Sequence, residues 1–268
     1  DLLVYNIAEN DDLLGVNAAN IDKDWAWVSK QNEKFGAEIA NISNEISQLA
    51  IQGPLALKAM QKLTAESVED MEYYTTKTLT FAGIENVIFS TTGYTGAGGC
   101  EIYFRNEDAE KIWNAVFEAG AEFDIKPIGL AARDTLRLEM GFCLYGHEID
   151  DTITPIEAGL GWITKFVDHK DFIDKERMLN MKAEGLKRKL VGFEMIDRGI
   201  PRLEYEVCDA EGNNIGIVRS GTIGPSVEKS IGTAWIKTEY AKVGTEIYIK
   251  IRNKLTKAIT VKMPFYKG

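Results

Sequence analysis

A glycine-rich stretch contains the first residues whose types and spacing could do chemistry. Residues 92–101 read TGYTGAGGCE and lead into the apolar run at 102–104. Glycines let a backbone approach a ligand closely. The spacing is neither that of a dinucleotide-binding loop nor that of a P-loop, and the predicted element that follows is a strand, so no helix N-terminus is available for phosphate. A tight turn between two strands is the alternative interpretation.

Glu101 stands where this loop enters the strand. A half-buried carboxylate needs hydrogen-bond donors. An ionised carboxylate accepts two in-plane hydrogen bonds, so a flat heterocycle with two adjacent N–H groups would suit it. Composition alone favours a different interpretation, in which Glu101 lies on an edge strand and pairs with a Lys or Arg.

Two arginines form the second candidate group. Arg133 and Arg137 are four residues apart in a predicted helix over 129–140, and they share a face with Asp134. Such arginines either close an internal ion pair or bind an anionic ligand. Because Asp134 offsets one positive charge, the internal ion pair is favoured.

Cys143 and His147 have the spacing of a two-ligand metal pair on a helix. Gly141 and Gly146 interrupt that helix, and the whole chain has only 2 His and 3 Cys. We therefore expect no metal site. The sparse, odd number of cysteines fits a reducing compartment, and we expect a cytoplasmic protein.

Charge and hydropathy exclude other classes of function. The 31 basic and 41 acidic residues give a net charge of −10, which disfavours non-specific binding of nucleic acid. No stretch reaches the roughly 20 apolar residues of a membrane helix, so no membrane contact is expected. Arg198 and Arg202 form a local basic patch near Lys187 that could steer an acidic partner, with solvated surface charge as the alternative.

Strand and helix patterns predict an α+β fold. The first part of the chain alternates the two kinds of element, beginning with a hairpin over 2–7 and 13–17 and a helix that runs to about 33. After Lys187 the pattern changes to short strands separated by turns. These strands predict a C-terminal antiparallel barrel or sandwich, with strands at 189–194, 205–208, 215–220, 231–236, 246–251 and 258–263.

Several short motifs follow one another in a specific order along almost the whole chain. They are DLLVY at 1–5, VNAANI at 16–21, KDW at 23–25, AIQGP at 50–54, TGYTG at 92–96, ARD at 132–134, RLE at 137–139, LYG at 144–146, PIEAGL at 155–160, Trp162, RKLVGF at 188–193, Gly232 and PFY at 264–266. As an ordered series they resemble the T-protein of the glycine cleavage system, the aminomethyltransferase family. The resemblance implies a folate-binding, multi-domain fold with a C-terminal barrel. We expect a remnant of the second α+β domain at 1–38, the folate-binding domain at 39–182 and the barrel at 183–268.

The resemblance also implies a reaction and its site residues. Family members transfer the methylene carbon from the aminomethyl-dihydrolipoyl arm of H-protein to tetrahydrofolate and release ammonia, without a metal. By resemblance Asp1 is the catalytic carboxylate, and Arg202 matches an arginine that meets H-protein. The implied folate-binding residues are Glu101, Arg133, Tyr94, Asn17 and Tyr266.

One departure from the family bears on activity. Family members carry a substantial segment before the residue that matches Asp1, and we expect this chain to lack it. A non-catalytic folate-binding remnant and a related folate-dependent demethylase are therefore alternative functions. A third relative is the iron–sulfur and tRNA-modification branch, which carries a Lys-Gly-Cys motif. The matching residues 143–148, CLYGHE, lack the preceding Lys-Gly, which argues against membership of that branch.

Overall fold

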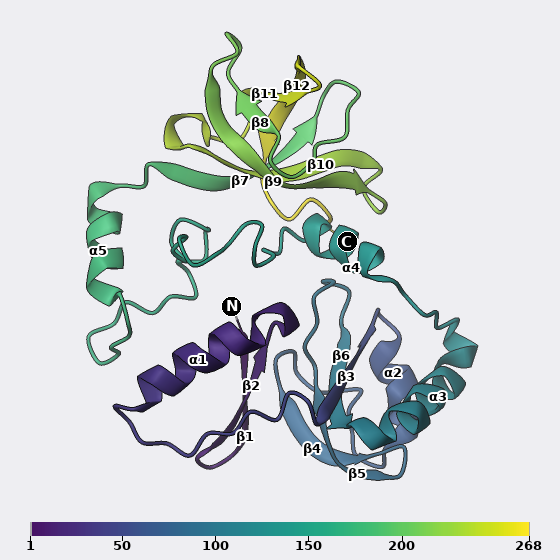
Figure 1. The fold of residues 1–268 in the computed structure, drawn as a ribbon. Coiled ribbons are helices and arrows are strands. Elements are labelled where there is room, and N and C mark those ends of the chain that lie inside the picture. The colour runs from purple at the N-terminus through teal and green to yellow at the C-terminus, as the bar shows by residue number, and fades with distance from the viewer. Residues whose placement is uncertain (1, 268) are drawn as a thin grey trace. The chain divides into compact units, whose positions relative to one another are not determined.

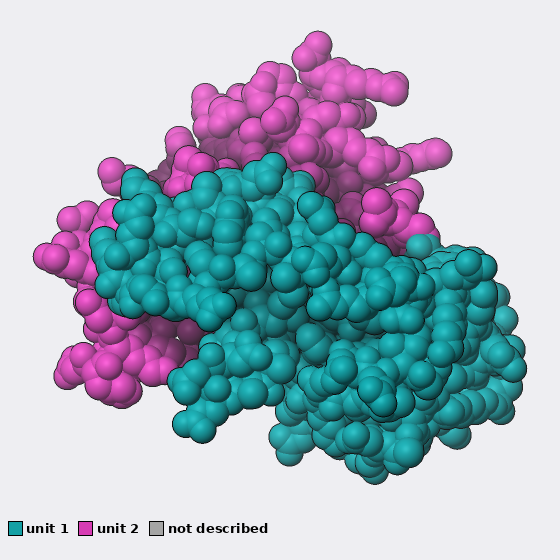
Figure 2. Space-filling model, turned by 60° about the horizontal axis from the view of Figure 1, so that its bottom comes forward, with its two compact units in different colours: residues 1–128 teal, residues 129–268 magenta. Residues whose placement is uncertain are grey.

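The computed structural model describes residues 2–267, so Asp1, the expected catalytic carboxylate, lies outside the described residues. The chain divides into two compact units, residues 1–128 and 129–268 (Figure 2). The first mixes helices with an antiparallel sheet, and the second contains a closed barrel. The predicted α+β class with a C-terminal antiparallel barrel is confirmed. The division at residues 38 and 182 stays a prediction.

Unit 1 begins with the predicted hairpin, β1 (Leu2–Ala8) and β2 (Asp11–Val16) (Figure 1). Asn10 takes a positive φ of 63° in the turn, a conformation that asparagine adopts more readily than most residues. Helix α1 (Ile21–Asn32) follows, with Asp22 and Asp24 in its first turn, where acidic side chains favour the helix dipole.

A four-stranded antiparallel sheet forms the centre of unit 1. Its strand order is β3 (Ile46–Gln52), β6 (Gly99–Arg105), β5 (Ile84–Ser90) and β4 (Thr76–Phe81). Side chains alternate between the two faces of a strand. On β6, Cys100, Ile102 and Phe104 are buried in the core with residues of α2 (Ala56–Met60) and α3 (Ala109–Gly120). The alternate residues, including Glu101, therefore lie on the opposite face.

The hairpin packs against that opposite face, on the other side of the sheet from α2 and α3 (Figure 1). Tyr5 of β1 is 3% exposed, and its ring meets the ring of Tyr103 edge to face with centroids 5.4 Å apart. The two phenol oxygens are 2.7 Å apart. The contact joins the hairpin to the strand that carries Glu101.

Unit 2 contains α4 (Leu130–Glu139), an irregular segment, α5 (Lys175–Glu184) and the barrel. The barrel closes in the order β10-β7-β12-β11-β8-β9 around a core that includes Phe193, Ile247 and Ile249. Its strands are β7 (Arg188–Met195), β8 (Glu206–Cys208), β9 (Asn214–Gly224), β10 (Lys229–Lys237), β11 (Glu246–Ile251) and β12 (Lys254–Val261).

The last barrel strand starts earlier than the sequence predicts. The expected strand was 258–263, whereas β12 begins at Lys254 and ends at Val261. Arg252 and Asn253 both have positive φ and form a two-residue turn that pairs Ile251 with Lys254. Such a turn matches the twist of a hairpin, so β12 pairs with β11 from the first residue after the turn. The first residues of β12 are mostly polar, so the apolar pattern of the sequence does not reveal them.

Among the described residues, no helix is both long enough and apolar enough to span a membrane.

Candidate functional site

Glu101 lies on an interior strand and is held by two uncharged side chains. It pairs with Ala50 of β3 and Ser90 of β5. Gln48 donates from Nε2 to Oε1 at 2.8 Å, and the Thr92 hydroxyl donates to Oε2 at 2.5 Å. Among the described residues no Lys or Arg forms an ion pair with this carboxylate. The edge-strand interpretation, with a basic partner, is therefore wrong.

The hydrogen-bond count at Glu101 leaves room for a ligand. Each carboxylate oxygen has two lone pairs, and each accepts one protein hydrogen bond. The side chain is half-buried, so part of it still faces solvent. A planar group with two adjacent N–H donors has an acceptor available on each oxygen.

Two phenols stand beside this carboxylate, that of the buried Tyr5 and that of the half-buried Tyr103. Burial raises the pKa of Tyr103 and of Tyr5, and the negative charge of Glu101 adds to both rises. Both phenols therefore stay protonated at physiological pH. They act as neutral hydrogen-bonding groups, and the negative charge of the cluster belongs to Glu101.

The glycine-rich loop connects β5 to β6 and is supported by Gln52. The Gln52 amide donates to the carbonyls of Thr92 at 3.2 Å and Cys100 at 3.0 Å, and its oxygen accepts from the Thr95 hydroxyl at 3.1 Å. A Cβ on Gly93 would lie 1.9 Å from the Gln52 Oε1 atom. A side chain at position 93 would displace the Gln52 amide from these hydrogen bonds, so glycine there keeps the brace of this inter-strand loop in place.

Sequence reasoning did not find Gln48, Thr92 or Gln52 as site residues. One signal was available for Gln48, which stands next to the apolar Leu49–Ile51 run of the predicted strand. Period-two alternation places it on the face opposite Leu49 and Ile51. Its pairing with β6 could not be read, because strand register depends on contacts distant in sequence.

The other two expected folate residues of unit 1 are both half-buried. Tyr94 lies on the glycine-rich loop, seven residues before Glu101. Asn17 directly follows β2, and its carbonyl accepts from the Asn20 N–H at 2.8 Å. Both side chains belong to the same unit as Glu101.

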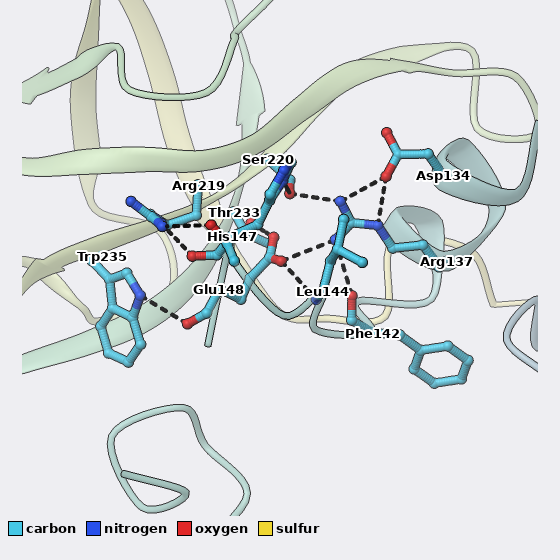
Figure 3. Close-up of polar contacts among 11 residues, drawn as sticks. Asp134, Arg137, Phe142, Leu144, His147, Glu148, Arg219, Ser220, Thr233 and Trp235 are labelled. Carbon is cyan, nitrogen blue, oxygen red and sulfur yellow. Dashed lines mark hydrogen bonds and ion pairs between the residues drawn. The ribbon is translucent and has the colours of Figure 1, made fainter. Parts of the chain in front are cut away.

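In unit 2, Arg137 closes an internal ion pair, as the sequence favoured (Figure 3). The side chain is 1% exposed and donates from Nη1 to Glu148 at 3.0 Å. The same guanidinium donates to Asp134 at 2.8 Å and to the Ser220 hydroxyl at 2.7 Å. The anion-binding alternative is therefore wrong for Arg137.

Glu148 connects the segment after α4 to the barrel (Figure 3). One carboxylate oxygen accepts from the Leu144 N–H at 2.9 Å, and the other accepts from the Thr233 hydroxyl of β10. Its backbone carbonyl accepts from the Trp235 indole at 3.0 Å. The neighbouring His147 lies with Nδ1 3.2 Å from the Ser220 hydroxyl. Within residues 2–267 no group of three His, Cys, Asp or Glu side chains is placed to hold a metal ion.

Helix α4 also positions two of the expected folate residues. Arg133 is exposed, one turn before Arg137. At the helix end, the Glu139 carbonyl accepts from the backbone N–H groups of Phe265, at 2.8 Å, and Tyr266, at 3.0 Å. The structure thus docks the C-terminal Tyr266, which is 43% exposed, on the helix that carries Arg133.

Arg202, the expected contact for H-protein, is exposed on the segment between β7 and β8. Arg198 on the same segment is exposed as well. Both arginines are therefore exposed on the barrel unit, and the basic patch that the sequence suggests stays a prediction.

Comparison with known families matches both parts of the chain. The GCVT N-terminal domain matches residues 1–168, and the glycine cleavage T-protein C-terminal barrel domain matches residues 188–267.

Individual relatives agree with these matches. An aminomethyltransferase of Bacteroides fragilis is 60% identical over 267 residues, which span all of this chain and 74% of that protein. An aminomethyltransferase of Caldanaerobacter subterraneus is 49% identical over 268 residues and is covered to 71%. The crystal structure of aminomethyltransferase T of the glycine cleavage system from Bartonella henselae superposes with a TM-score of 0.89 at 29% identity, covering 99% of this chain and 72% of that one. This chain belongs to the glycine cleavage T-protein family, whose members are aminomethyltransferases that use tetrahydrofolate as cosubstrate.

Proposed function

We propose that this aminomethyltransferase holds the pterin ring of tetrahydrofolate at Glu101 and receives the aminomethyl group on the dihydrolipoyl arm of H-protein. Tetrahydrofolate supplies the nitrogens that accept the methylene carbon, and ammonia is released. The chain's own side chains bind, orient and shield the reactants, and the reaction needs no protein nucleophile. Positioning of this kind can supply most of a rate enhancement.

The observation that carries the proposal is the hydrogen bonding of Glu101. The carboxylate has no cationic partner among the described residues, and Gln48 and Thr92 each occupy one lone pair of one oxygen. The remaining lone pairs suit the adjacent N–H groups on the edge of a pterin ring.

The remaining residues have roles taken from the family. Tyr94 on the glycine-rich loop would pack on or beside the pterin. Asn17, Arg133 and Tyr266 would contact the folate. Asp1, as the catalytic carboxylate, would orient the reacting nitrogen and stabilise positive charge that develops on the transferred carbon.

H-protein would meet the exposed Arg202 on the barrel surface. A long-range electrostatic contact there would favour encounter with an acidic partner. We place the reaction in the bacterial cytoplasm, because the matched relatives are bacterial and the three cysteines are free thiols, as in reducing compartments.

Calorimetric titration of the 268-residue chain with 5-formyltetrahydrofolate, a stable folate, tests the proposal. Glu101→Gln should weaken binding by about 1.5–3 kcal/mol, because a charge-assisted contact is lost. The matched control is Glu45→Gln, which removes an exposed carboxylate that pairs with Arg105 in the same unit, and it should leave affinity unchanged. Unchanged affinity in Glu101→Gln would remove Glu101 from the folate site.

A further inference from the structure

A continuous series of hydrogen bonds runs along the sheet face that carries Glu101. The Tyr5 and Tyr103 hydroxyls are 2.7 Å apart. Gln48 donates from Nε2 to the Tyr103 hydroxyl at 3.1 Å and, from the same nitrogen, to Glu101 at 2.8 Å. Four side chains from β1, β6 and β3 are thus joined into one series that ends at the carboxylate.

The carboxylate at one end of the series determines the direction of the two hydrogen bonds that Gln48 makes. The Gln48 amide nitrogen has two protons, one for Glu101 and one for Tyr103. If the amide were turned over, its oxygen would face the carboxylate, and two acceptors would repel each other. Tyr103 therefore accepts from Gln48, and either phenol can donate in the hydrogen bond between Tyr103 and Tyr5.

Burial differs strongly along the series. Tyr5 is 3% exposed and is anchored in the hairpin, whereas Gln48 is exposed on the sheet. Exposed hydrogen bonds contribute little to stability, because water replaces them when they break. Loss of the Gln48 amide should therefore leave the fold intact, with the Glu101 carboxylate held by the Thr92 hydroxyl alone.

Resting on the proposed function of Glu101, we propose that Gln48 is a positioning residue that orients the Glu101 carboxylate for the pterin edge, and that Tyr103 and Tyr5 hold Gln48 in place. The hairpin strand β1 begins at Leu2, the residue after Asp1. The series therefore connects the pterin carboxylate to the strand that follows the expected catalytic carboxylate in sequence.

A double-mutant cycle tests the role of Gln48, with 5-formyltetrahydrofolate titrated into the 268-residue chain. Gln48→Met keeps the side-chain length but removes both donors. It should weaken binding about tenfold, and it should cause no further loss in a Glu101→Gln background, because no carboxylate remains to be oriented. The melting temperature should match that of the parent chain. Gln31→Met, the same change on α1, is the control and should bind normally.

Tyr103→Phe provides a second variant, which keeps the ring packing against Tyr5 and removes only the hydroxyl. It should weaken binding by less than Gln48→Met does, and the effect should vanish in a Gln48→Met background. Normal affinity in Gln48→Met, or losses for Gln48→Met and Glu101→Gln that simply add, would overturn the positioning role alone. Normal affinity in Glu101→Gln would overturn the proposed function of Glu101 and the positioning role with it.

Discussion

The Arg137 guanidinium and the Glu148 carboxylate form a buried ion pair, with Nη1 3.0 Å from Oε2 and each side chain 1% exposed. Burial of two charges is costly unless further hydrogen bonds satisfy them. The guanidinium also donates hydrogen bonds to Asp134, Ser220 and the Phe142 carbonyl. The carboxylate accepts further hydrogen bonds from the Leu144 N–H and the Thr233 hydroxyl. The pair therefore joins α4, which carries Arg133, to two strands of the barrel.

Breaking this pair should destabilise unit 2. Glu148→Ala removes the buried partner of the Arg137 charge and leaves only the half-exposed Asp134 beside it, and we expect the free energy of unfolding to fall by about 3–5 kcal/mol. Urea unfolding followed by circular dichroism measures the change. Arg177→Ala breaks an exposed ion pair with Asp174 on α5 and serves as the control, with little change expected. Equal urea midpoints of unfolding for the two variants would show that the buried ion pair does not stabilise unit 2 more than the exposed one does.

A side chain at position 93 should displace the Gln52 amide. In Gly93→Ala the new Cβ would overlap the Gln52 amide, which must then give up its bonds to the Thr92 and Cys100 carbonyls. We expect a loss of about 1–3 kcal/mol in the free energy of unfolding and weaker folate binding, because the loop leads directly to Glu101.

Two variants check this explanation of Gly93→Ala. Gly161→Ala places a Cβ at an ordinary contact distance of 3.5 Å from Ile156, and it should change neither the free energy of unfolding nor folate binding. In a Gln52→Ala background the overlap is gone, so Gly93→Ala should cost little more. Additive losses in that double variant would show that Gln52 does not explain the need for glycine.

The exposed Arg202 should affect the binding of H-protein rather than the binding of folate. Arg202→Ala should raise the apparent KM for H-protein roughly two- to fivefold at low salt, and the difference should shrink as salt screens the charge. Steady-state kinetics at two ionic strengths measure it. Arg252→Ala removes an exposed arginine from the β11–β12 turn and is the matched control. An unchanged KM at low salt would show that Arg202 is a solvated surface charge with no role in binding H-protein.

Asp1, which lies outside the described residues, should act on turnover. Asp1→Asn removes the charge that orients the reacting nitrogen, so kcat should fall about a hundredfold while folate affinity changes much less. Turnover with H-protein and calorimetry with 5-formyltetrahydrofolate provide the two measurements. Asp11→Asn, at the exposed start of β2, is the control. Equal losses of affinity and turnover would make Asp1 a binding residue only.

The elements that the sequence predicts well are those with local signals. The alternation in 2–7 and the turn at Asn10 suffice for the hairpin. The short strands after Lys187 suffice for an antiparallel barrel or sandwich, and the structure forms the barrel. The start of β12 was missed because it depends on pairing with β11 through the Arg252–Asn253 turn, and its first residues carry no apolar pattern.

The sequence by itself determined the fold class, the family and the residue types at the candidate site, because periodicity, turn residues and ordered motifs are local properties. It also placed Arg133 and Arg137 on one helical face, but only packing decided that Arg137 is buried, through partners such as Ser220, 83 residues away. The hold on Glu101 by Gln48, 53 residues away, likewise depends on the register between β3 and β6. Strand register and helix docking arise from contacts distant in sequence, so only the tertiary structure could decide which neighbours these charged groups have.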